Sequence, residues 1–114
     1  MDNCIFCKII AGDIPSDRVY EDEDMIIIRD INPQAPVHLL LIPKEHYADI
    51  TCLNAERAAT LGRCLNKLQD IVGNIPQLKD GFRLINNKGE FAGQTVGHMH
   101  VHILGGTAMG EGLL

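Results

Sequence analysis

The sequence predicts one α+β domain over residues 1–114, with a mainly antiparallel five-stranded sheet, one long helix and one short helix. Three observations predict this class: short apolar runs of strand length, one long segment with helical periodicity, and turn residues that separate neighbouring runs. A chain of 114 residues can bury one hydrophobic core, although burial against a partner subunit would add to its stability.

The first half of the chain is expected to form a short helix and three strands. In order, the expected elements are a helical turn at 6–11, strands at 18–21 and 25–30, a loop at 31–36 and a strand at 38–42. Gly12 stops the helical turn, and the acidic run at 21–24 is a solvated turn between the first two strands. Pro33 and Pro36 each remove a ladder donor, so the segment around them is a loop.

The second half is expected to form the long helix and the last two strands. The helix runs from about residue 54 to 75, because apolar residues recur there at intervals of three and four. This apolar stripe consists of Leu61, Leu65, Leu68, Val72 and Ile75. Asn54 is the expected N-cap, and Glu56 complements the helix dipole. Strands at 82–86 and 99–104 follow, joined by a glycine-bearing loop at 87–95.

The composition excludes several classes of function. A formal charge of -5 and the lack of a basic run argue against a nucleic-acid polymer as partner, because binding to the phosphate backbone needs clustered Lys and Arg. No apolar stretch is long enough to cross a membrane, and the first residues do not resemble a signal peptide. We therefore expect a cytoplasmic protein, in which the four cysteines are reduced.

Three histidines, His98, His100 and His102, stand at alternate positions. In a strand they would share one face, with neighbouring side chains about 6.7 Å apart at a rise of roughly 3.3 Å per residue. The opposite face would carry Met99, Val101 and Ile103. Such a row is too long for one metal ion to bind all three rings. It suits an extended anion such as a phosphate chain, with one ring attacking and the others donating hydrogen bonds.

The segment Cys4-Ile5-Phe6-Cys7 supplies two of the four soft ligands that a structural zinc ion needs. His46 and His98 are the candidates for the other two. Inert packing and a redox pair are the alternatives, although a thioredoxin-like pair follows a strand and only three residues precede Cys4. Cys52 and Cys64 are expected to pack as small apolar residues.

Nearly the whole chain resembles the histidine triad family of nucleotide hydrolases and transferases, in its purine nucleoside phosphoramidase-like branch. The resemblance is carried by residues 5–10 (IFCKII), 30–38 (DINPQAPVH) and 93–106 (GQTVGHMHVHILGG). It implies an α+β sheet that pairs with the sheet of a second subunit, giving a homodimer. It also implies a pocket for a nucleoside 5'-phosphate and no organic cofactor.

Carried over by position, the resemblance assigns catalytic roles to four histidines. His100 matches the nucleophile that attacks the α-phosphorus and becomes a covalent nucleotidyl-histidine. His102 matches a ring that contacts the phosphate, and His98 with His38 matches the supporting histidines. A neutral imidazole is a good nucleophile when its other nitrogen is held as a donor, and a backbone carbonyl could hold His100 in this way.

The resemblance also assigns the binding residues. Asp30 matches the ribose-binding carboxylate and Ile31 lines the base pocket. The loop that holds phosphate and leaving group is matched by Asn87, Gly93, Gln94 and Thr95. Alone, the Gly93 loop would more often be a turn, since it lacks the Gly-Lys-Ser/Thr ending of a P-loop. Asp30 alone would be a turn or capping residue in most chains.

Some bacterial members of this family place zinc between residues that match Cys4, Cys7, His46 and His98 here, which implies a structural zinc site. The implied activity is hydrolysis of purine nucleoside 5'-phosphoramidates or related mixed phosphates. A dinucleoside polyphosphate hydrolase, a non-catalytic nucleotide- or partner-binding protein and a zinc hydrolase using the triad histidines are the alternatives. Related phosphoramidases often end in an aromatic-containing tail, whereas residues 107–114 contain no aromatic and several glycines.

Overall fold

The computed structural model describes residues 3–113, and it confirms the α+β class with five strands. The elements are α1 (Ile5–Ala11), β1 (Arg18–Glu21), β2 (Met25–Arg29), β3 (Val37–Pro43), α2 (Ala55–Gly73), β4 (Phe82–Ile85) and β5 (Val101–Gly105), with short 3-10 turns η1 (Ile50–Cys52), η2 (Pro76–Leu78) and η3 (Glu90–Ala92). No helix in this described part of the chain is long and apolar enough to span a bilayer.

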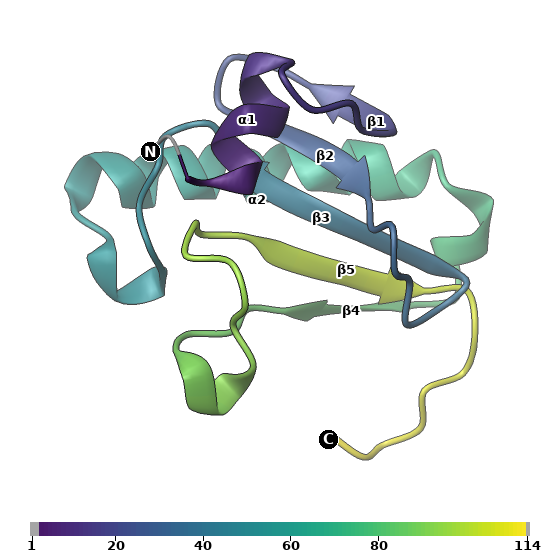
Figure 1. Cartoon of the computed structure of the whole chain (residues 1–114). Helices are drawn as coiled ribbons and strands as arrows, with labels where there is room; N and C mark the ends of the chain where they lie inside the picture. Colours follow the sequence, from purple (N-terminus) through teal and green to yellow (C-terminus); the bar gives the residue numbers. More distant parts are fainter. Residues whose placement is uncertain (1–2, 114) are drawn as a thin grey trace.

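The five strands form one antiparallel sheet in the order β1-β2-β3-β5-β4. The central strand β3 is buried along its whole length, since it has a strand on either side and a helix over each face. In Figure 1, α1 crosses in front of the sheet and α2 lies behind it. The two edges of the sheet are therefore β1 and β4.

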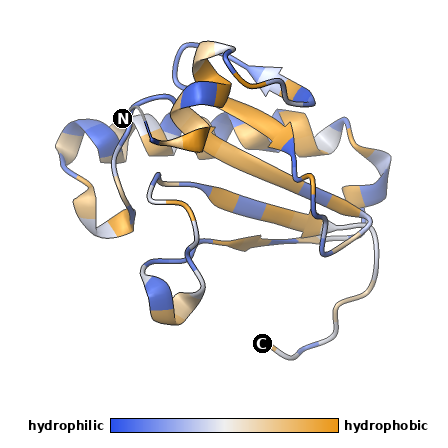
Figure 2. Cartoon of the chain, in the orientation of Figure 1, coloured by the Kyte–Doolittle hydropathy of each residue, from blue (hydrophilic) through white to orange (hydrophobic). Residues whose placement is uncertain are grey.

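Alternation along β2 and β3 divides the apolar core into two layers. Met25 and Ile27 point to the α2 side, whereas Ile26 and Ile28 point to the α1 side. Because both faces are covered, these strands are almost continuously apolar rather than alternating, and Figure 2 shows them nearly uniformly orange. Strand β5 instead carries hydrophilic bands in Figure 2, since only one of its faces packs in the α2 layer.

Helix α2 is confirmed, with one correction to its buried stripe. The side chain of Asn54 accepts a hydrogen bond from the backbone N–H of Arg57 at 2.8 Å, as expected of an N-cap. The residues buried from this helix are Cys64, Leu68 and Ile71. Leu65 was wrongly placed in the stripe and is exposed, because the small apolar Cys64 occupies the core-facing position one residue earlier. The helix also ends at Gly73, two residues before the expected end.

Cys64 lies in the main core, as expected of a packing residue, and burial raises the pKa of its thiol to about 11. Cys52 packs at the edge of the same core.

The short helix α1 begins one residue earlier than expected and ends at Gly12, whose φ of 85° is a left-handed conformation that favours glycine. Strands β2 and β4 each end one residue before their expected ends.

The last strand begins later than expected. β5 starts at Val101, so His98 and His100 lie in the segment before the strand rather than in it. The pairing of β3 with β5 stops at Leu41 and Val101, and the backbone N–H of Met99 donates instead to the carbonyl of Tyr47 at 2.7 Å. The apolar residues of this segment still share one face, as expected, since Met99 and Val101 pack in the α2 layer with Ile103.

Candidate functional site

All five histidines of the chain gather on the α1 side of the sheet. His38 and His102 pair with each other beside Asp30, and His46 and His98 face the two N-terminal cysteines. His100 lies between these groups, its ring centre 5.1 Å from that of His102.

The tautomer of His100 follows from its hydrogen bond. Its Nδ1 lies 2.8 Å from the backbone carbonyl oxygen of His98, and a carbonyl only accepts, so Nδ1 carries the proton. In the neutral ring the lone pair is then on Nε2. Phe6 packs edge-on against this ring, with centroids 5.1 Å apart and planes at 85°. His100 is thus buried and fixed from two sides, with one nitrogen available as a nucleophile.

His38 and His102 form a directed chain of hydrogen bonds. The backbone N–H of Gln34 donates to Nδ1 of His38 at 3.0 Å, so the proton of the neutral His38 ring is on Nε2. That nitrogen lies 2.9 Å from Nδ1 of His102 and 3.4 Å from Oδ2 of Asp30. His102 accepts on Nδ1 and therefore carries its own proton on Nε2. Burial lowers the pKa of His102, helped by the neighbouring His100 and His38, which keeps this ring neutral.

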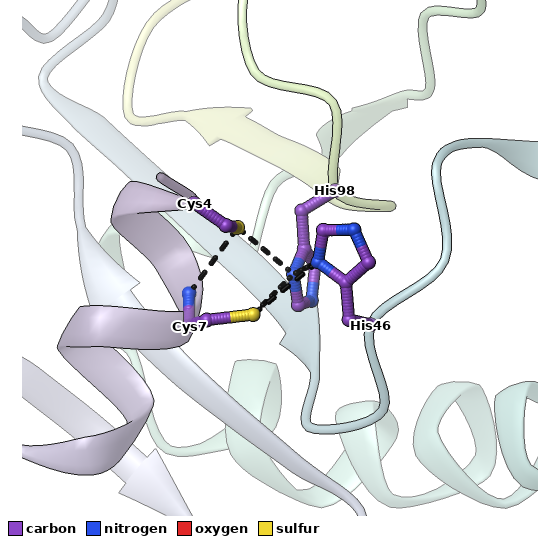
Figure 3. Close-up of side chains that lie close together, drawn as sticks. All are labelled: Cys4, Cys7, His46 and His98. Atoms are coloured by element: carbon purple, nitrogen blue, oxygen red, sulfur yellow. Dashed lines mark hydrogen bonds between the residues drawn. The ribbon is translucent and has the colours of Figure 1, made fainter. Parts of the chain in front are cut away.

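His98 is fully buried and its two nitrogens have different partners. Nε2 donates to the carbonyl of Pro43 at 2.8 Å, which leaves the lone pair on Nδ1. Burial lowers the pKa of His98, and the nearby His46 and His100 lower it further. The unprotonated Nδ1 of His98 points to the sulfurs of Cys4 and Cys7 (Figure 3).

Four ligand atoms converge at this point. The sulfurs of Cys4 and Cys7 and the Nδ1 atoms of His46 and His98 all lie within 4.8 Å of one another. Cys4 Sγ is 3.4 Å from His98 Nδ1, Cys7 Sγ is 3.2 Å from His46 Nδ1, and the two Nδ1 atoms are 3.1 Å apart. Around a tetrahedral zinc ion with ordinary bond lengths, the sulfur and nitrogen ligand atoms lie roughly 3.3–3.8 Å from one another. The donor set and its spacing therefore fit a metal ion.

Several backbone contacts hold this group together. Cys4 is the N-cap of α1, and its sulfur accepts a hydrogen bond from the backbone N–H of Cys7 at 3.4 Å. The segment after His46 is joined to the segment around His98 by the bond from Met99 to Tyr47. The first turn of α1, a loop and the start of the triad segment are thereby brought to one place.

The loop at 87–95 leads directly into the triad segment, and the side chain of Gln94 organises it. Its Oε1 accepts from the backbone N–H of Gly89 at 2.8 Å, and its Nε2 donates to the carbonyls of Ala48 and Val96 at 2.8 and 3.0 Å. Gly93 has a φ of 86°, which makes the turn possible, and Thr95 is exposed on the same loop. The structure gives Gln94 three backbone partners, so its carboxamide braces the loop.

Two further residues contact His100 that sequence reasoning did not select. Asn86, directly after β4, donates from its side-chain amide to the carbonyl oxygen of His100 at 2.9 Å. Phe6 lies in the expected helical turn and in the IFCKII segment but was given no role of its own, yet its ring contacts both His98 and His100. Asn86 is the last residue of the strand expected at 82–86, and its contact with His100 depends on the pairing of β4 with β5. Asn87, which was selected, has no comparable contact with His100.

Asp30 and Ile31 lie at the other end of β3 from the cysteines. One carboxylate oxygen of Asp30 accepts from the backbone N–H of Asn32 at 2.8 Å, which is the turn role expected of such a residue. Its other oxygen faces His38. Ile31 is 97% exposed, an unusual position for an apolar side chain beside a polar site.

Comparison with known proteins identifies the family. The family described as "Scavenger mRNA decapping enzyme C-term binding" matches residues 3–113. Protein HitA of Neisseria gonorrhoeae is 48% identical over 105 residues, which are 92% of this chain and 97% of that protein. The purine nucleoside phosphoramidase of Escherichia coli K12 is 42% identical over 106 residues, 93% of this chain and 89% of the enzyme.

Solved structures agree. A HIT family hydrolase from Clostridium thermocellum superposes with a TM-score of 0.95 at 46% identity, covering 100% of this chain and 99% of that one. A histidine triad protein from Clostridium difficile gives a TM-score of 0.90 at 39% identity, covering 98% and 96%. The chain is therefore a member of the histidine triad family and belongs with its hydrolases.

Proposed function

We propose that this protein hydrolyses purine nucleoside 5'-phosphoramidates, or related mixed phosphates, through a covalent nucleotidyl-histidine on His100. The observation that carries the proposal is the bond from Nδ1 of His100 to the carbonyl of His98, which leaves Nε2 as the free nucleophilic nitrogen. Its 42% identity to an enzyme named purine nucleoside phosphoramidase supports the choice of substrate class.

In the first step Nε2 of His100 attacks the α-phosphorus. The nitrogen–phosphorus bond forms as the bond from phosphorus to the leaving amine breaks, and the amine takes up a proton. His102 has its proton on Nε2 and can donate it to a phosphate oxygen or to the departing group. The hydroxyl of Thr95 can serve the same leaving group from the loop.

In the second step water attacks the phosphorus of the nucleotidyl-histidine. The bond to Nε2 breaks and the nucleoside monophosphate leaves, while the proton released by the water replaces the one that His102 donated in the first step. The His100 ring then returns to its starting tautomer. The His98 carbonyl stabilises the developing charge on His100 in both steps, since it holds the Nδ1 proton throughout.

The substrate is held by residues on both sides of the histidines. We propose that Asp30 binds the ribose hydroxyls, and that the exposed Ile31 side chain covers the base. Gly93 and Thr95, with Asn87, contact the phosphate and the leaving group, because a glycine in the left-handed conformation lets backbone N–H groups approach an anion. Gln94 supports them through the loop backbone.

We propose that Cys4, Cys7, His46 and His98 hold a zinc ion with a structural role. The spacing of the four ligand atoms supports tetrahedral coordination. Zinc bound by four protein ligands would tie α1 to the triad segment and would have no open position for water. His98 donates its other nitrogen to Pro43, an outer hydrogen bond typical of metal-bound histidines.

We also propose a homodimer formed by pairing the sheet edges at β4, in a cytoplasmic protein whose resting state has reduced thiols. Phe82 and Leu84 on this edge strand are exposed, and an apolar edge strand with one side unpaired can add a strand from a second copy. We propose neither a nucleic-acid polymer nor a membrane as a binding partner.

A trapping experiment tests the reaction. The protein is mixed with a panel of purine phosphoramidates and dinucleoside polyphosphates, quenched in a single turnover, and digested for peptide mass spectrometry. We expect a nucleoside monophosphate adduct on the peptide that contains His100, with free amine and nucleoside monophosphate as products. Steady turnover with no adduct on this peptide at any time would contradict the proposal, and binding without turnover on any substrate would favour a binding protein.

A further inference from the structure

The segment that links Cys4 to Cys7 contacts the proposed nucleophile. Phe6 lies between the two cysteines, and its ring packs edge-on against His100 at 5.1 Å and against His98 at 5.9 Å. Phe6 is buried in the α1 layer of the core, so it has little room to move independently of the cysteines. A change in the conformation of this segment is therefore transmitted to the His100 ring.

His98 gives a second connection. Its Nδ1 lies 3.4 Å from the sulfur of Cys4 and 3.6 Å from that of Cys7, while its carbonyl oxygen accepts the Nδ1 proton of His100. The same residue therefore contacts both sulfurs and fixes the tautomer of the nucleophile. Because His98 is fully buried, loss of its contacts to the sulfurs has to be accommodated by the surrounding backbone.

Cys4 is also accessible to a small reagent. A hollow of about 280 Å³ opens beside it, lined by Asn3, Cys4, Ile5, Thr95, Val96 and Gly97. Gly97 borders open space, since a Cβ placed there would meet no atom within 4 Å. Cys64, by contrast, is buried in the core on the other side of the sheet.

We propose that Cys4 and Cys7 form a reversible disulfide in exchange with a low-molecular-weight disulfide such as oxidised glutathione, and that this disulfide switches off His100. The loss of metal in this proposal rests on the zinc site proposed above, whereas the disulfide and its effect on His100 rest on the contacts of Phe6 and His98 alone.

The exchange balances without a further reactant. The Cys4 thiolate attacks one sulfur of the external disulfide, so that a mixed disulfide forms and one thiolate leaves. The Cys7 thiolate then attacks the Cys4 sulfur, the Cys4–Cys7 bond forms, and the second external thiolate leaves. Two electrons pass from the cysteine sulfurs to the external disulfide, and the two cysteine protons go to the departing thiolates.

The new bond changes the site. In a disulfide the two sulfur atoms are about 2.05 Å apart. In the structure the four ligand atoms, including both sulfurs, lie within 4.8 Å of one another. Neither sulfur can then bind a metal as a thiolate, so a bound ion loses two of its four ligands. The main chain around Phe6 adjusts, and with it the packing on His100.

The test uses the full chain with Cys52→Ala and Cys64→Ala, which removes the other two thiols and leaves the Cys4–Cys7 pair. Protein purified without chelator is incubated with oxidised glutathione, and a matched sample receives reduced glutathione. Intact-mass and peptide mass spectrometry report the disulfide, a chromogenic chelator reports released zinc, and imidazole NMR signals report the state of His100. Unsubstituted protein with peptide mapping replaces the variant if the latter does not fold.

We expect a mass loss of two hydrogens that maps to Cys4 and Cys7, together with release of zinc. The NMR signal of His100 should shift, and turnover should fall by about tenfold or more. Dithiol and added zinc should reverse all of these changes. Cys7→Ala should stop at the mixed disulfide. Failure to form the disulfide, or a disulfide that leaves the His100 signal unchanged, would overturn the switch. Reduced protein that hydrolyses no phosphoramidate would contradict the proposed function instead, and the mass and NMR readouts would still decide the switch.

Discussion

The ring of His100 is hydrogen bonded to the main chain of His98, with 2.8 Å between Nδ1 and the carbonyl oxygen. The ring of His98 in turn faces the sulfurs of Cys4 and Cys7. The nucleophilic nitrogen of one histidine is therefore set by a neighbour whose own position depends on the cysteine group. This relationship joins the proposed chemistry to the proposed metal centre through a single residue.

Replacing His100 with Ala should abolish turnover and leave nucleotide binding largely intact, because Asp30, the Gly93 loop and His102 still hold the ligand. A loss of about a thousandfold or more in kcat is expected for a missing nucleophile. Stopped assays of phosphoramidate hydrolysis and calorimetric binding of a nucleoside monophosphate measure the two effects. Lys79→Ala, at an exposed position outside the site, is the control. Near-normal turnover in His100→Ala would rule out this mechanism.

Asn86 should act as a positioning residue for His100. Asn86→Asp keeps the shape of the side chain but replaces the amide donor with a carboxylate, so the bond to the His100 carbonyl is lost. We expect kcat to fall about tenfold with little change in KM, and the melting temperature to fall by only a few degrees, since one hydrogen bond contributes about 1 kcal/mol. Asn86→Gln, which retains a donor, should recover part of the loss. A change in KM alone would mean that Asn86 contacts substrate.

The fold was largely predictable from the sequence, because its elements depend on local patterns. Asn54 marked the start of α2, Gly12 marked the end of α1, and the apolar runs marked the strands. The start of β5 was not predictable, since it depends on Met99 bonding to Tyr47, a residue far away in the sequence. Strand periodicity therefore gave the correct face for the histidines but placed the start of the strand too early.

The site residues were only partly predictable, again because some of their contacts depend on segments that are distant in the sequence. The triad and the Cys4–Cys7 pair are short patterns with a defined chemistry, and the structure brings Cys4 and Cys7 together with His46 and His98. The contact between Asn86 and His100 depends on the pairing of β4 with β5, which a single sequence does not reveal. Phe6 was missed because an aromatic residue in an apolar helix is most simply a core residue.

Protein purified without chelator should contain about one zinc per chain at Cys4, Cys7, His46 and His98. Removing the zinc should lower the melting temperature more than it lowers the rate of the chemical step, because a closed structural site has no position for water. Elemental analysis and thermal unfolding measure this, with Cys4→Ala losing the metal and Cys52→Ala retaining it. Less than about 0.2 zinc per chain, with unchanged melting on zinc addition, would count against the site.

His102 should titrate below the ordinary histidine value of about 6.5, because burial and the neighbouring rings lower its pKa. Between that lowered pKa and 6.5 the unfolded chain binds more protons than the folded one, so stability rises with pH across this window and falls as the solution is acidified. Imidazole NMR gives the pKa, and urea unfolding between about pH 5 and 7.5 gives the slope. His102→Gln should reduce the slope and leave the part due to His98, whose pKa burial also lowers, whereas an unchanged slope would place the titration elsewhere.

The C-terminal tail contacts the β4 edge of the sheet. The guanidinium of Arg83 on β4 contacts the carbonyls of Gly110 and Gly112 at 3.4 and 3.2 Å, so the tail lies against the edge strand that we propose pairs with a second copy. The exposed apolar side chains of this edge predict a dimer, which light scattering of the intact protein should detect. Leu84→Glu, which places a charge on the exposed edge, should weaken the dimer, and a monomer of the intact chain at micromolar concentration would contradict it.

Deleting residues 109–114 should change the preference among leaving groups much more than the binding of a free nucleoside monophosphate. No triad residue lies in the tail, so the phosphate chemistry is retained, whereas a tail at the dimer edge can reach the departing group of a neighbouring site. Arg83→Ala is the matched test, because it releases the tail without removing it. We expect both variants to shift the relative kcat/KM values across a substrate panel in the same direction. A uniform loss across every substrate would show that the tail supports folding instead of selectivity.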